Sequence, residues 1–233
     1  MRRGPGARAV PRREAEPARV SEVRTDDAGR RDDDCGVDGE IVDAGRLAFD
    51  ATPPLNGRKL DLRDAPDPTR RSIGFQSKDA RIVTAIPGTR GDPTCSAPGG
   101  GGATLRVFGT GGSGQDTGPM ALPCQHWSPI GAAADEKGYV YRDSQEADGP
   151  CKKELLKNGR QIKALCDGKN PIHPVDFDPT VAGVGSVGVV LKLGAGRVPY
   201  CAEFEPTSAT VRTDDELRFR AENAAPPASC PFP

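Results

Sequence analysis

Histidine and aromatic residues are scarce in this sequence. Of its 233 residues only two are histidine, and aromatic residues make up 5%. There is no Cys-x-x-Cys pair either, so the usual ligand spacings of a zinc site are missing and we predict no metal or cofactor. No apolar run approaches the ~20 residues that cross a bilayer as a helix. The formal net charge of −1 gives the whole chain no excess of one sign. We therefore predict neither a membrane span nor a nucleic-acid partner.

Lysine and aromatic side chains are absent from the first 48 residues; the first aromatic residue is Phe49 and the first lysine is Lys59. Arginine and acidic residues are interspersed here with very few apolar ones, a composition that buries too little surface to fold. We predict a disordered segment or linker over residues 1–48 and a single domain over residues 49–233. Residues 1–49 contain no apolar segment of a signal peptide. A misplaced start or a fragment of a larger exported protein would explain this.

Glycine and proline are abundant, with 29 and 23 residues, and they bound short segments in which apolar and charged residues alternate. Leu60 and Leu62 begin this pattern, and later examples are residues 81–86, 103–108, 138–142, 186–193 and 198–204. Period-two alternation between turn residues is typical of β-strands. The fold class predicted is all-β, an antiparallel β-sandwich of about eight to ten short strands stapled by disulfides.

The seven cysteines are dispersed along the chain, at positions 35, 95, 124, 151, 166, 201 and 230. Dispersed cysteines without metal spacing indicate a disulfide framework in an oxidising compartment. We therefore expect a secreted or periplasmic protein. The alternative is a cytosolic protein with reduced thiols.

The segment from Cys151 to Cys166 predicts a β-hairpin with Asn158-Gly159 as its turn, because this pair is preferred in type I′ turns. In that register Leu156 faces Gln161 and the two cysteines face each other, at a spacing that a disulfide tolerates. Lysine, glutamate and leucine also favour a helix, but Asn-Gly in the middle of the segment argues against it.

Two further pairs follow from position. Cys230 lies close to the end of the chain, and Cys201 is its nearest neighbour in sequence, so we expect a bridge that holds the end in place. Cys95 and Cys124 flank the strands predicted over residues 103–122 and form the remaining pair. Cys35 is left as the free thiol.

Candidate functional residues are few. Trp127, Tyr139 and Tyr141 are the candidate ligand-binding residues, because exposed rings can stack on sugars. Asp176 and Asp178 offer paired carboxylates, as glycoside hydrolysis needs. Cys124 and His126 have no second cluster to complete a metal shell. Residues 109–114 match G-x-G-x-x-G, but Pro119 follows, and the helix that a dinucleotide site requires cannot form there.

Several short segments of the sequence resemble those of an uncharacterised module of exported, modular bacterial proteins. They lie at residues 59–64, 102–107, 150–163, 200–204 and 230–231. The resemblance extends from Lys59 to Pro231, roughly three quarters of the chain. It implies export and a β fold, and it carries over no functional residue. Cys95 and Cys124 lie outside these segments.

The residues show no nucleophile–base arrangement, so they favour a protein that is not an enzyme. We predict a non-catalytic extracytoplasmic structural or binding module. The alternative is a carbohydrate-binding domain or a glycan-active enzyme that uses the three aromatic residues and the Asp176/Asp178 pair. A cell-surface or extracellular protein, or a glycan, would suit either as a partner.

Overall fold

The structure is a computed structural model, and it describes residues 54–177, 183–195 and 198–231. The segment 1–48, predicted to be disordered, and Cys35 lie outside these residues. The strands of the described part are β1 (Gly57–Arg63), β2 (Ser72–Ser77), β3 (Ala103–Gly109), β4 (Met120–Leu122), β5 (Trp127–Pro129), β6 (Gly138–Arg142), β7 (Cys151–Lys157), β8 (Gln161–Asp167), β9 (Val187–Leu193), β10 (Val198–Phe204), β11 (Thr210–Asp215) and β12 (Arg218–Ala224). Three single-turn 3-10 helices, η1 (Pro68–Arg70), η2 (Cys124–His126) and η3 (Ala133–Asp135), lie between them.

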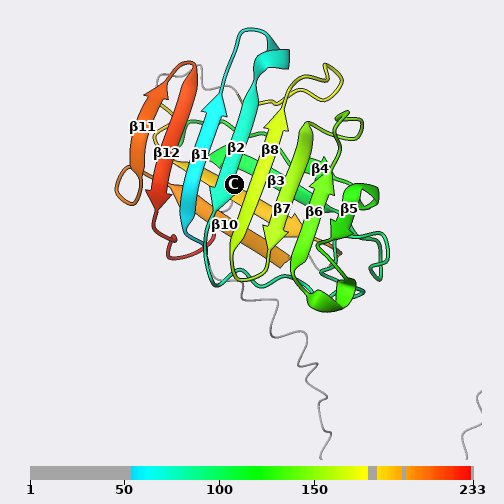
Figure 1. The fold of residues 1–233 in the computed structure, drawn as a ribbon. Helices are drawn as coiled ribbons and strands as arrows, with labels where there is room; N and C mark the ends of the chain where they lie inside the picture. Colours follow the sequence, from blue (N-terminus) through cyan, green and yellow to red (C-terminus); the bar gives the residue numbers. More distant parts are fainter. Residues whose placement is uncertain (1–53, 178–182, 196–197, 232–233) are drawn as a thin grey trace, which may run out of the picture. The chain divides into compact units, whose positions relative to one another are not determined.

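These strands form two sheets. The larger has eight strands in the order β11-β12-β1-β2-β8-β7-β6-β5, and the smaller has four in the order β10-β9-β3-β4. All the strand pairs are antiparallel. The smaller sheet lies behind the larger, and its strands cross those of the larger sheet steeply (Figure 1). The predicted all-β, sandwich-like fold is confirmed. The described part has twelve strands, more than the predicted eight to ten. Two of them, β4 and β5, are only three residues long.

The core lies between the two sheets. Leu60 and Leu62 are buried on the inner side of β1, as their alternation predicts. The rings of Phe75 in β2 and Phe204 in β10 meet edge to face across the core, 6.3 Å apart. A Cβ atom at Gly57 would lie 2.5 Å from the Phe204 ring. Position 57 therefore has room for a glycine alone.

The smaller sheet is covered on its other side as well. Phe108 and Val190 point away from the main core and pack with Cys201 in a second apolar cluster, against which Cys230 lies. The disulfide Cys201–Cys230 fastens the C-terminal segment to β10 on this side. The outer side of the smaller sheet is thus partly covered by the chain itself.

The hairpin formed by β7 and β8 has a different register from the predicted one. Leu156 pairs with Ile162 rather than with Gln161, so the loop holds three residues, 158–160. A bulge between Cys151 and Lys153 absorbs the shift and brings the two cysteines opposite each other again.

Contacts from elsewhere in the chain hold the tip of this hairpin. The backbone N–H of Gly159 donates to the carbonyl of Ile82 (2.7 Å), and that of Asn158 donates to Lys137 (3.1 Å). The side-chain oxygen of Asn158 accepts a bond from the Thr84 N–H. Gly159 has a φ of 62°, whereas Asn158 is not among the residues with positive φ. The turn is therefore not type I′, which needs a positive φ at both positions.

Residues 81–86 form no strand, contrary to the alternation of their side chains. Their backbone groups form hydrogen bonds instead with side chains of the two sheets and with the tip of the β7–β8 hairpin. The hydroxyl of Tyr139 donates to the Ala85 carbonyl, and that of Tyr200 donates to the Val83 carbonyl. This segment is therefore a connection that closes one end of the sandwich.

The disulfides of the structure are Cys95–Cys124, Cys151–Cys166 and Cys201–Cys230, the pairs expected from the sequence. Three disulfides fit an extracellular or periplasmic protein. Helices long and apolar enough to cross a membrane do not occur in the described part of the chain.

Candidate functional site

The three aromatic residues proposed as a ligand platform are buried. The exposed fractions of Trp127, Tyr139 and Tyr141 are 5%, 1% and 0%. Trp127 and Tyr141 pair across β5 and β6 with their rings 5.4 Å apart. The indole N–H donates to the Leu122 carbonyl, which satisfies its one donor inside the core. These rings present no face to a sugar, which corrects the expectation of a stacking platform at these positions.

This burial extends to every aromatic side chain that the structure describes: Phe75, Phe108, Trp127, Tyr139, Tyr141, Phe177, Tyr200, Phe204 and Phe219. Sugars and unpaired bases are commonly held by stacking on exposed rings. In the described part of the chain, a ligand must be recognised by other means.

The predicted carboxylate pair is only partly placed. Asp176 is exposed in the connection after β8, and Asp178 lies outside the described residues. Another carboxyl pair, which the sequence did not suggest, is formed by Glu146 and Asp167. Both are buried, and burial together with the hydrogen bond to Asp167 holds the pKa of Glu146 above its usual range. The N–H of Asn170 donates to Glu146, so the pair ties two connections together.

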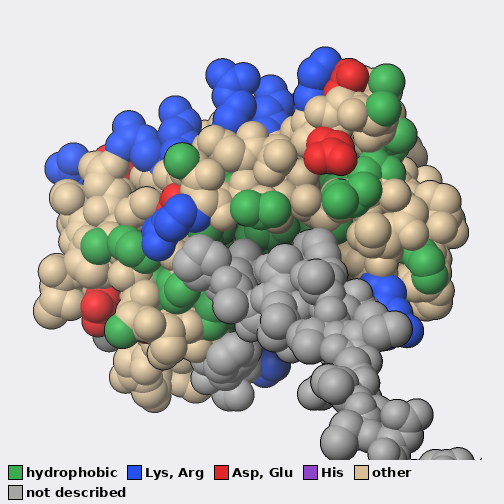
Figure 2. All heavy atoms as spheres, turned by 90° about the horizontal axis from the view of Figure 1, so that it is seen from below, with side chains coloured by type: hydrophobic (Ala, Val, Ile, Leu, Met, Phe, Trp, Pro, Cys, Tyr) green, Lys and Arg blue, Asp and Glu red, His purple; other side chains and the backbone are tan. Residues whose placement is uncertain are grey.

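The outer face of the larger sheet is open and strongly basic. Its outward side chains include Lys59, Arg63, Arg142, Lys153, Lys157, Lys163, Arg218 and Arg220, and the acidic residues on the same side are Asp61, Asp167, Asp215 and Glu222. We call this surface the basic face. In Figure 2 lysine and arginine side chains stand in a row along the top of the view, on the side of the larger sheet.

Two of these carboxylates, Asp61 and Glu222, are paired with cations of β12. Asp61 accepts two bonds from the Arg218 guanidinium, 2.9 and 2.8 Å long, and Glu222 pairs with Arg220 at 2.8 Å. Burial alone would raise the pKa of Asp61, but the bonds and charge of Arg218 hold that pKa below its usual value.

Five cations of the basic face form no ion pair with any residue that the structure describes. They are Arg63, Arg142, Lys153, Lys157 and Lys163. Arg142 and Lys153 are directly opposed across β6 and β7. Lys163 faces Leu155, so it is the diagonal neighbour of Lys153. Like charges in these positions destabilise a sheet.

A shallow groove of about 390 Å³ crosses the basic face above β2. Gly74 leaves the gap, because it has no side chain between the longer residues of β1 and β8. Lys59 and Arg63 line the groove on one side and Lys163 on the other. A Cβ atom at Gly74 would come no closer than 3.8 Å to other atoms, so the groove is open above this residue.

A larger hollow, of about 720 Å³, lies on the outer side of the smaller sheet. Its described lining is mostly glycine, alanine and proline, with Arg106 and Lys192 as the charged members. The guanidinium of Arg106 is bound to Asp116. The described lining therefore brings no acid–base pair together.

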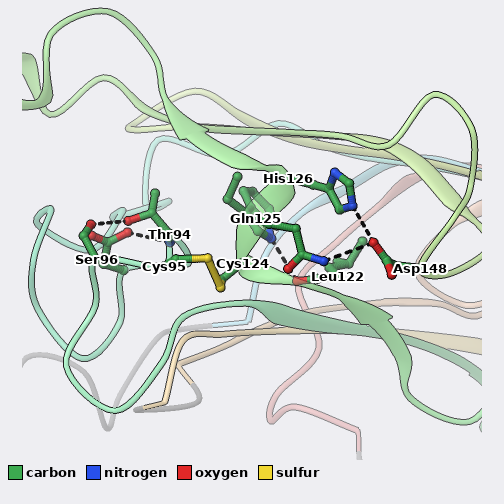
Figure 3. The surroundings of a disulfide bond; sticks show 10 residues. Thr94, Cys95, Ser96, Leu122, Cys124, Gln125, His126 and Asp148 are labelled. Carbon is green, nitrogen blue, oxygen red and sulfur yellow. Dashed lines mark hydrogen bonds and ion pairs between the residues drawn. A yellow bond between two sulfur atoms is a disulfide. The ribbon is translucent and has the colours of Figure 1, made fainter.

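His126 and two aspartates meet at one end of the larger sheet. His126 follows Cys124 in η2, and the disulfide to Cys95 anchors this turn (Figure 3). The His126 Nε2 atom lies 2.7 Å from the Asp148 carboxylate, which also accepts a bond from Gln125 (Figure 3). Asp143, 4% exposed, lies 3.9 Å from the same nitrogen.

Searches against protein-family models, curated proteins and solved structures found no match to this chain. The resemblance to an exported bacterial module rests on the short sequence segments alone. The function must therefore be argued from the geometry of the described residues.

Proposed function

We propose that this domain is a non-catalytic extracytoplasmic binding module whose basic face binds a linear acidic polysaccharide. The observation that carries the proposal is the set of five cations without an ion-pair partner among the described residues, with Arg142, Lys153 and Lys163 as direct or diagonal neighbours. A face that served only solubility would mix charges of both signs, whereas the outward residues of β6 and β7 include Arg142, Lys153 and Lys157 and no acidic residue. An anionic ligand would relieve the repulsion between these cations and bind through charge-assisted hydrogen bonds.

The chemistry of the face favours a polysaccharide over other polyanions. Single-stranded nucleic acid is usually held by stacked aromatic side chains, and every described aromatic ring is buried. A membrane would favour exposed apolar side chains, and in the described part of the chain the large exposed ones are Val83, Ile86, Ile172 and Leu217, all outside the strands. A uronic-acid polymer needs neither feature. Its carboxylates suit the bidentate geometry of Arg63 and Arg142.

The spacing of the cations suits a chain-like ligand. Neighbouring strands lie about 4.8 Å apart, and alternate residues of a strand about 6.6 Å apart. Lys59 and Lys163 therefore stand about 10 Å apart on either side of β2, with the groove between them. A polymer with a carboxylate on each sugar can contact several cations along such a path.

Catalysis is not part of the proposal. The described carboxyls with raised pKa, Glu146 and Glu154, are both buried. Neither is among the residues that line the groove or the larger hollow.

The experiment compares binding of decameric polygalacturonate with its methyl-esterified form, which has the same backbone without charge. We expect binding of the free acid alone, weakening as salt is added. The double variant Lys153→Glu/Lys163→Glu should lose at least about tenfold in affinity, because each lost bond to a charged group contributes about 1.5 kcal/mol or more. The control Arg90→Glu/Lys192→Glu makes the same change in net charge on the side of the smaller sheet, away from the basic face, and should bind normally.

Two outcomes would contradict the proposal. Equal binding by the Lys153/Lys163 variant and the wild type would remove the basic face as the site. Tighter binding to a DNA duplex or to polyglutamate than to polygalacturonate would reject the polysaccharide as the ligand.

A further inference from the structure

The cluster of His126, Asp143 and Asp148 is independent of the basic face. Asp143 directly follows β6, and its backbone N–H donates to the Lys152 carbonyl. The carboxylate of Asp143 accepts a bond from the Asp148 N–H at 3.1 Å, which folds the connection back toward η2. The cluster is thus built from a strand end, a folded connection and a turn anchored by a disulfide.

The spacing of the donor atoms is close to that of a tetrahedral metal site. One ligand atom from each of the three residues lies within 4.8 Å of the others. The Nε2 atom of His126 lies 2.7 Å from Asp148 and 3.9 Å from Asp143. Ligands about 2.0 Å from a tetrahedral ion are about 3.3 Å apart. Shifts of less than about 1 Å would therefore bring these two pairs to the required separation.

A second observation comes from the residue packed behind the cluster. The ring of Tyr141 meets the imidazole of His126 edge to face at 5.5 Å. Its hydroxyl is fully buried and has no hydrogen-bond partner among the described residues. A cation with its bound water would place a hydrogen-bonding group in this polar corner of the core.

We propose that His126, Asp143 and Asp148 bind one divalent transition-metal ion, with zinc as the best-fitting ion. One imidazole and two carboxylates are zinc ligands, and three protein ligands leave a fourth position for water. Calcium takes six to eight oxygen ligands and does not suit a set that includes an imidazole. The bound ion would neutralise the two aspartates and fix the connection after β6 to η2.

The experiment is a titration of zinc chloride into the intact, oxidised protein, followed by calorimetry. We expect one saturable site. The variants His126→Gln and Asp148→Asn should each weaken zinc binding at least about a hundredfold, since even loss of a residue that only supports a metal ligand costs tenfold to a hundredfold. The matched control is His173→Gln, because His173 contacts the same connection through the Ala147 carbonyl but is not part of the cluster. Its affinity should not change.

Two further arms keep the test decisive. The chain has only two histidines, so imidazole nitrogen signals in an NMR spectrum report His126 directly, and zinc should shift one of the two sets. A Cys35→Ser variant should bind zinc as the wild type does. Absence of saturable binding below about 100 µM zinc, equal loss in the His173 control, or loss in the Cys35 variant would each overturn the proposal.

Discussion

Replacing Glu154 with glutamine is expected to stabilise the domain at neutral pH. Glu154 lies in β7 with its side chain pointing into the core, opposite Tyr141, and it is 1% exposed. Neither of its carboxyl oxygens has a hydrogen-bond partner among the described residues. Burial raises the pKa of this carboxyl from 4.5 to about 8.

The sign of the effect follows from proton binding. Between pH 4.5 and 8 the folded protein holds a proton on Glu154 that the unfolded chain has released. The free energy of unfolding therefore falls as the pH rises through this range, by about 1.4 kcal/mol per pH unit at most. At pH 7 the loss amounts to about 3 kcal/mol relative to a side chain that stays neutral. Glutamine has the shape of the protonated acid and does not titrate.

The assay is urea unfolding with disulfides intact, at pH 5, 6, 7 and 8 and with a chelator present to exclude metal binding. The Glu154→Gln variant should differ from the wild type by less than about 1 kcal/mol at pH 5 and gain stability over it as the pH rises. Glu203→Gln, on the outer side of β10, is the control and should follow the wild type. Parallel stability curves for wild type and Glu154→Gln would refute the reasoning, because they would mean that Glu154 titrates alike in both states.

Three other variants test the fold. Replacing both Cys151 and Cys166 with alanine should lower the free energy of unfolding by about 3 kcal/mol, measured by urea unfolding, because the bridge closes a loop of about 15 residues. An unchanged midpoint would show that the bridge constrains little. Gly159→Ala should lower the melting temperature by about 2–4 °C, because Gly159 has a φ of 62° and alanine there costs about 1 kcal/mol. An unchanged melting temperature would mean that the turn relaxes. Gly57→Ala should cost about 1–3 kcal/mol in calorimetry through its clash with the Phe204 ring, and wild-type stability would show that this ring moves freely.

Local sequence patterns were sufficient for the cysteine pairs and for most of the strands, but not for residues 81–86, which alternate and form no strand. The alternation around Leu60 and along residues 186–193 identified strands, because the side-chain period of a strand is read directly from the sequence. The Asn158-Gly159 pair placed the hairpin turn correctly. The register of the two strands, however, depended on backbone hydrogen bonds from the turn to Ile82 and Lys137. Those partners are distant in sequence, so the turn pattern alone could not reveal them.

The functional surface was harder to predict than the fold. Alternation places Tyr139 and Tyr141 on one face, but it does not say whether that face is the inner or the outer one. The net charge of −1 conceals the basic face, because the cations are gathered only when β6, β7 and β8 pair. The meeting of His126 with Asp148 likewise depends on the fold, since 22 residues separate them.

The most direct test of the basic face as the binding surface is an NMR titration of the folded protein with decameric polygalacturonate. Backbone amide signals should shift in β1, β2, β7 and β8, with the largest changes near Gly74, Lys153 and Lys163. The methyl-esterified polymer should leave these signals unchanged. Shifts confined to the hollow around residues 99–102, or none at saturating polymer, would contradict the proposed function.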